Sequence, residues 1–137
     1  VYNRALPGGP RMSRAKTAGL IFVTLFFVIG GLGHFVVTDF FVHIMPPYIP
    51  WPREMVWLSG VIELALAAAI WVRRWRPLAG LLLMALICVV SLANIHMWQH
   101  PERFPEVPEW ALTLRLVLQV GLLWLVWWST RPPVSRR

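Results

Sequence analysis

Four apolar stretches separated by short polar connections constrain this chain more than any other feature. Helical spans are expected at 17–38, 55–72, 77–98 and 111–129. Each is long enough to cross ~30 Å of hydrocarbon at a rise of ~1.5 Å per residue. The composition agrees, since 58% of the 137 residues are hydrophobic and only 14% are charged, which is too apolar for an ordinary soluble domain. The sequence therefore predicts an all-α membrane protein, a four-transmembrane-helix bundle.

The basic residues are unevenly distributed between the two sides of this predicted bundle. One side holds ten of them: Arg4, Arg11, Arg14, Lys16, Arg73, Arg74, Arg76, Arg131, Arg136 and Arg137. The two connections on the other side hold only Arg53 and Arg103. The positive-inside rule therefore predicts a cytoplasmic basic N-terminus at 1–16 and a cytoplasmic basic tail at 130–137. The basic residues occur in short runs between apolar stretches, which is typical of membrane flanks rather than of a nucleic-acid-binding face.

Two other residue types support the membrane assignment. The nine tryptophans are expected at the two interfaces, where amphipathic rings prefer to lie. The single cysteine, Cys88, excludes a disulfide within the chain and a paired-thiol redox centre. The first apolar stretch resembles a signal peptide, yet it continues for ~20 residues without a small-residue cleavage site, so we expect it to be a retained helix.

The connection between the first two spans is a proline-rich interfacial segment. Residues 39–45 are expected to form a turn or short helix with an apolar face. Pro46, Pro47, Pro50 and Pro52 are then expected to impose extended backbone. This segment is either a rigid connector or a lid over a lipid-facing pocket. The second connection on that side, 99–109, is acidic and also broken by prolines.

Several polar residues occur where hydrocarbon is expected, and all of them map to the outer half of the bundle. They are His34, Glu63, Asn94, His96, Arg115 and Gln119. Because an ionisable group there costs at least ~2.5–3.5 kcal/mol on insertion scales, each needs a partner or a role. Ser59, Gly60, Glu63 and Ala67 form a stripe at helical spacing, which predicts that Glu63 points into the bundle.

Opposite charges in a low dielectric should pair, so Glu63 and Arg115 are the predicted ion pair. This pair would either only lock two helices together or belong to a pocket that receives a polar head group. His34 and His96 could in principle hold a haem or a metal between helices, but Asn94 and His96 face different directions, and no metal motif is present. His96 is instead expected to pair with His100 at the interface.

Taken together, these residues resemble the DoxX-like membrane proteins. The resemblance spans about 19–128 and rests on four motifs: Gly31 with His34 and Phe35; Met45-Pro46-Pro47-Tyr48-Ile49-Pro50; Ser59-Gly60 with Glu63; and Ala93-Asn94-Ile95-His96-Met97. Arg115 with Gln119 also matches the last-helix pattern, although Val117 replaces a proline common there. The resemblance implies a bacterial-type inner-membrane protein with site residues His34, Glu63, Asn94, Arg115 and Gln119. Further candidates are His96, Ser59 and Tyr48.

Some DoxX-like proteins are subunits of quinone-linked oxidoreductases, so the resemblance implies a redox-associated membrane subunit that binds a quinone or a lipid head group. No intrinsic cofactor is expected, and the expected partners are the bilayer and other membrane subunits. In this reading His34 exchanges a proton with a carbonyl oxygen, Arg115 polarises it and Glu63 holds Arg115 in place. The alternatives are a non-catalytic structural or assembly subunit and, third, a transporter, which would have to oligomerise to enclose a path.

Overall fold

The fold was analysed in a computed structural model that describes residues 11–132, and every regular element in that range is helical. In chain order the elements are α1 (Arg14–Val36), α2 (Thr38–Ile44), α3 (Pro52–Ala69), α4 (Arg76–Gln99), the 3-10 helix η1 (Pro101–Arg103) and α5 (Glu109–Thr130). Arg4, Arg136 and Arg137, which belong to the predicted basic ends, lie outside the described residues. The predicted all-α class is confirmed for this part of the chain.

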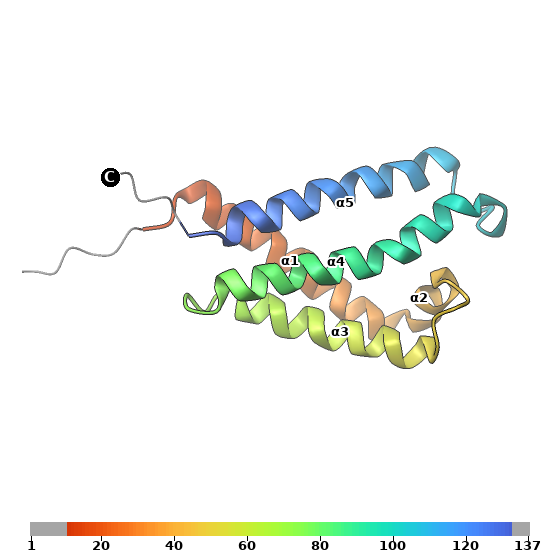
Figure 1. Ribbon diagram of the computed structural model, residues 1–137, viewed down its shortest axis with the longest axis horizontal. Helices are drawn as coiled ribbons and strands as arrows, with labels where there is room; N and C mark the ends of the chain where they lie inside the picture. Colours follow the sequence, from red (N-terminus) through yellow and green to blue (C-terminus); the bar gives the residue numbers. More distant parts are fainter. Residues whose placement is uncertain (1–10, 133–137) are drawn as a thin grey trace, which may run out of the picture.

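The four long helices lie alongside one another and alternate in direction (Figure 1). The start of α1, the α3–α4 connection and the end of α5 lie at one end, which we call the basic end. Helix α2, the segment 45–51 and η1 lie at the opposite end, which we call the α2 end. Helix α1 packs on α3 and α5, and α4 packs on the same two helices, so the four surround a common interior.

The helix ends follow from local hydrogen bonding. The Ser13 side chain accepts from the Lys16 amide at 3.2 Å, and this N-cap starts α1 three residues before the predicted Thr17. At the end of α3, Arg76 Nε donates to the Ile70 carbonyl at 2.7 Å. This bond satisfies a carbonyl that has no partner within the helix. Helix α3 therefore ends at Ala69, short of the predicted Val72.

The proline-rich connection agrees with the prediction only in part. The expected short helix is confirmed as α2, which follows a break at Val37. Pro46 begins a turn closed by the Ile49 amide, and Pro52 occupies the first turn of α3 rather than extended backbone. Proline fits the first helical turn because its missing N–H would have no partner there. Trp51, just before it, has a left-handed backbone conformation with a φ of 47°.

Three of the described helices, α1, α4 and α5, are long and apolar enough to cross a membrane. Helix α3 has 18 residues, including three charged ones, Arg53, Glu54 and Glu63, and does not belong to that set. Large apolar side chains point outward around the molecule, such as Ile29 with 70% and Val36 with 81% of their surface exposed. A helix set that is apolar on its outside as well as inside requires a lipid solvent. The fold is therefore that of a membrane protein.

Close backbone contact between α1 and α3 depends on two glycines, Gly31 and Gly60. A Cβ atom added at Gly60 would lie 2.8 Å from His34 Cβ and 3.0 Å from the Gly31 carbonyl oxygen. A Cβ at Gly31 would lie 3.1 Å from the Gly60 carbonyl oxygen. Small residues at such positions let membrane helices approach closely and form van der Waals contacts along their length.

We predict that Gly60→Ala destabilises the protein by about 1–3 kcal/mol, because the added methyl group meets backbone that cannot move aside. Gly121→Ala is the matched control, since a Cβ there meets nothing within 4 Å. It should be neutral or slightly stabilising. Unfolding of both variants in detergent micelles, followed by circular dichroism, measures the difference. Equal stabilities of the two variants would contradict the close α1–α3 contact.

Candidate functional site

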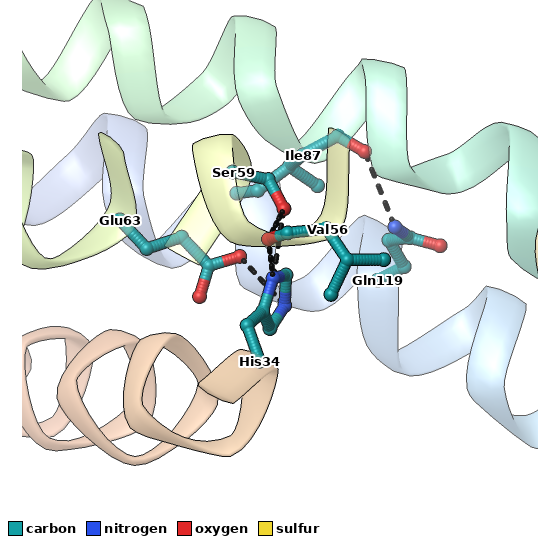
Figure 2. A network of polar contacts seen from close by, with 6 residues as sticks. All are labelled: His34, Val56, Ser59, Glu63, Ile87 and Gln119. Atoms are coloured by element: carbon teal, nitrogen blue, oxygen red, sulfur yellow. Dashed lines mark hydrogen bonds and ion pairs between the residues drawn. The ribbon is translucent and has the colours of Figure 1, made fainter. Parts of the chain in front are cut away.

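The first polar network joins α1 to α3 and is centred on His34 (Figure 2). His34 Nδ1 lies 2.8 Å from the Val56 carbonyl oxygen and 2.7 Å from Ser59 Oγ. On the other side of the ring, Nε2 lies 3.5 Å from Glu63 Oε1. His34 and Glu63 are 4% and 6% exposed. The predicted inward orientation of Glu63 is therefore confirmed.

The Val56 carbonyl determines which nitrogen of His34 carries a proton. A carbonyl oxygen can only accept, so Nδ1 must carry the hydrogen that it donates to Val56. Nε2 of the neutral ring is then an acceptor facing Glu63, and the pair has room for one further proton. That proton lies either on the Glu63 carboxyl group or on Nε2, which makes His34 and Glu63 a dyad able to take up or release a proton.

The second polar network joins α4 to α5. Arg115 donates to Asn94 Oδ1 from Nε at 3.1 Å and from Nη2 at 2.8 Å. Asn94 Nδ2 donates to Gln119 Oε1 at 2.9 Å. Gln119 Nε2 in turn donates to the Ile87 carbonyl oxygen at 3.2 Å, as Figure 2 shows. The chain of donors and acceptors thus runs from a cation through two amides to a backbone carbonyl.

The predicted ion pair between Glu63 and Arg115 is wrong. Within residues 11–132, the ionisable partner of Glu63 is His34, and Arg115 bonds to an amide oxygen rather than a carboxylate. The five principal candidates are therefore divided between two networks: His34 with Glu63, and Asn94 with Arg115 and Gln119. The physical reason is proximity. Glu63 on α3 lies next to His34 on the neighbouring helix α1, and Arg115 on α5 lies next to Asn94 on the neighbouring helix α4.

The three further candidates lie in different places. Ser59 belongs to the first network and donates to the Val56 carbonyl oxygen at 2.8 Å. The His96 ring lies against His100, with centroids 4.8 Å apart, so the predicted pairing of these two histidines is confirmed. Tyr48 is exposed in the segment after α2 and lines a cavity together with His96. Among the described residues, no three His, Cys, Asp or Glu side chains are grouped to hold a metal.

Thr38 is a buried polar residue that the sequence reasoning did not select. Its hydroxyl donates to the His34 carbonyl oxygen at 2.7 Å and accepts from Trp57 Nε1 at 3.2 Å. It therefore ties the end of α1 to α2 and α3 directly beside the first network. A threonine four residues after His34 was a usable signal, since threonine at this spacing commonly bonds back to the i−4 carbonyl.

Comparison with protein families assigns this chain to one family. The chain belongs to the family described as a domain of unknown function, DUF8561, whose model matches residues 23–130. The match includes all residues of both networks. No curated protein and no solved structure matches the chain.

The two networks predict which pairs of residues are energetically coupled. In double-mutant cycles with Asn94→Leu and Arg115→Met, we expect a coupling energy on the order of 1–3 kcal/mol, because the guanidinium loses both bonds to one oxygen. A cycle with Glu63→Gln and Arg115→Met should give less than about 0.5 kcal/mol, because these side chains do not bond. Unfolding in detergent measures both. A larger coupling energy for Glu63 with Arg115 than for Asn94 with Arg115 would show that Glu63 and Arg115 form the ion pair, and would contradict the structure.

Proposed function

We propose that the protein crosses a bacterial-type inner membrane four times, with both ends in the cytoplasm. The additional span is α3, whose 18 residues reach about 27 Å at ~1.5 Å per residue. Arg53 and Glu54 fall in its first turn at the α2 end, and its third charge, Glu63, faces His34 inside. The described basic residues of the flanks gather at the basic end, as the positive-inside rule requires of a cytoplasmic side.

Single-cysteine labelling tests this topology. In a Cys88→Ser background, Tyr48→Cys should react with a membrane-impermeant maleimide on intact cells, whereas Arg74→Cys should react only after permeabilisation. Both side chains are exposed, so access to the reagent depends on the membrane alone. Labelling of both positions on intact cells would mean that α3 does not span, because the α3–α4 connection would then share a side with α2.

We further propose that the protein is a DoxX-like subunit of a quinone-linked redox complex, in which the two networks receive the head group of a quinone or lipid. The observation that carries this proposal is the state of Arg115. Its guanidinium is half-buried and bonds to Asn94, yet it meets no carboxylate among the described residues. A cation in an apolar segment without a counter-charge is costly. A carbonyl or anionic head group would supply the missing acceptor.

The two networks would contribute different chemistry to such a ligand. Arg115 would donate to a head-group oxygen and polarise it, with Asn94 fixing the guanidinium plane. The dyad of His34 and Glu63 would give or take one proton, which is what a quinone carbonyl requires when its redox state changes. Glu63 thus acts on His34 rather than on Arg115. Electrons would come from a partner subunit.

The triple variant Asn94→Leu, Arg115→Met, Gln119→Leu tests the ligand-binding role. It removes all three side chains of the second network at once, so no buried side chain of that network is left without a partner, and such replacement can be nearly neutral for folding. We expect the folded variant to lose co-purifying quinone or lipid at least about tenfold, because a charged hydrogen bond is lost. Mass spectrometry of lipid extracts measures the ligand, and Arg53→Met is the matched arginine control.

The second candidate function is a structural or assembly subunit, favoured by a different observation. Every buried side-chain nitrogen and oxygen among residues 11–132 already has a hydrogen-bond partner. Networks that satisfy themselves can serve helix registry alone. In that case the triple variant would retain its ligands and the activity of its complex, and only its stability would change. This result would reject the ligand-binding role.

A further inference from the structure

A separate cavity of about 240 Å³ lies at the α2 end, between the segment after α2 and the last turns of α4. None of the five principal site residues lines it. Its polar walls are formed by Tyr48, His96, Gln99, His100 and Arg103. Arg103 is cationic, and the two histidine rings can donate hydrogen bonds. The cavity is therefore a concave, basic site distinct from both networks.

His96 is the most informative wall residue. It is 9% exposed, and its ring nitrogens have no hydrogen-bond partner within residues 11–132, although the ring lies against His100 and near Phe104. Every fully buried side-chain nitrogen among the described residues has a partner, so these ring nitrogens must be accessible from the cavity. Because the side chain lines the cavity, a ligand there can supply the missing bond.

The charges around the cavity favour an anion. Glu102 is the nearest acid along the chain, and its carboxylate lies 3.2 Å from His100 Nδ1. A backbone hydrogen bond, His100 and Arg103 lower the pKa of Glu102 below its usual value, so Glu102 stays ionised. Arg103 forms no ion pair among the described residues. Its guanidinium lines the cavity and can bond to a ligand there.

The apolar part of the wall continues along the same face of α4. Leu92 and Ile95 line the cavity at positions i and i+3, and His96 and Gln99 follow at i+4 and i+7. Leu92 is 43% and Ile95 38% exposed on the outside of the helices. The stripe therefore runs from hydrocarbon depth to the interface, and changes from apolar to basic at the level of lipid head groups.

From this geometry we infer that the cavity binds the phosphate of an anionic glycerophospholipid. Arg103 and His96 hold the phosphate oxygens, Tyr48 and Gln99 line the head group, and an acyl chain lies along Leu92 and Ile95. A guanidinium with neighbouring donors suits phosphate oxygens. The apolar stripe favours a lipid over a free phosphate ion, because only a lipid has an acyl chain that can contact Leu92 and Ile95.

Native mass spectrometry of the full chain in detergent tests this site. The probes are dioleoyl-phosphatidylglycerol, dioleoyl-phosphatidylcholine and free glycerol 3-phosphate, each titrated against wild-type protein. We expect phosphatidylglycerol to bind at least about tenfold more tightly than the other two, and Arg103→Gln and His96→Gln each to reduce its affinity about tenfold or more. Arg53→Gln should bind as wild type, because Arg53 lies at the same end but pairs with Asp39.

Three results would overturn the proposal. Equal binding of the two lipids would remove the preference for an anionic head group. Equal loss in Arg53→Gln and Arg103→Gln would show a general surface charge effect instead of a site. If glycerol 3-phosphate bound as tightly as phosphatidylglycerol, the ligand of the cavity would be a soluble phosphate and not a lipid. Arg103 is exposed, so its replacement leaves the fold intact, and the outcome reports binding.

Discussion

Hydrocarbon cannot hydrogen-bond, and the arrangement of this protein depends on that constraint. Each polar side chain within an apolar helix must find its partner on another helix or on its own backbone. His34 finds Glu63 and Ser59 across the α1–α3 contact, and Asn94 finds Arg115 across the α4–α5 contact. The two antiparallel pairs are therefore each fixed by a polar network, while the shared interior at the basic end is built from apolar residues.

The sequence was sufficient for the helices and for most of what faces inward. Apolar runs indicated the four long helices to within a few residues, because helix length in a membrane is set by hydrocarbon thickness. The spacing of Gly60, Glu63 and Ala67 correctly predicted the buried face of α3. Helix ends were less predictable, since they depend on individual caps such as the bond from Arg76 to the Ile70 carbonyl.

Partner choice within the site was not predictable in the same way. Attraction between opposite charges suggested Glu63 with Arg115, and depth along the helices allowed it. Depth, however, does not say which helices are neighbours at a given level or how their faces rotate. The glycines Gly31 and Gly60 bring α1 against α3 so closely that His34 reaches Glu63 first. The partner of Glu63 was therefore determined by which helices are in contact, and not by attraction between opposite charges. Helix contact is a property of the folded chain.

The two networks respond differently to a change in their surroundings. Arg115 keeps its charge and is held by the two bonds to Asn94, so it is a positive charge of fixed position. In the dyad, the Val56 carbonyl fixes one proton on His34, and only the proton between Nε2 and Glu63 can change place. Close packing at Gly31 and Gly60 brings His34 and Glu63 within 3.5 Å of each other, so that proton can respond to a charge nearby. A ligand or partner that brings negative charge close to His34 would therefore favour the imidazolium form, whereas one that brings positive charge close to Glu63 would favour the carboxylate.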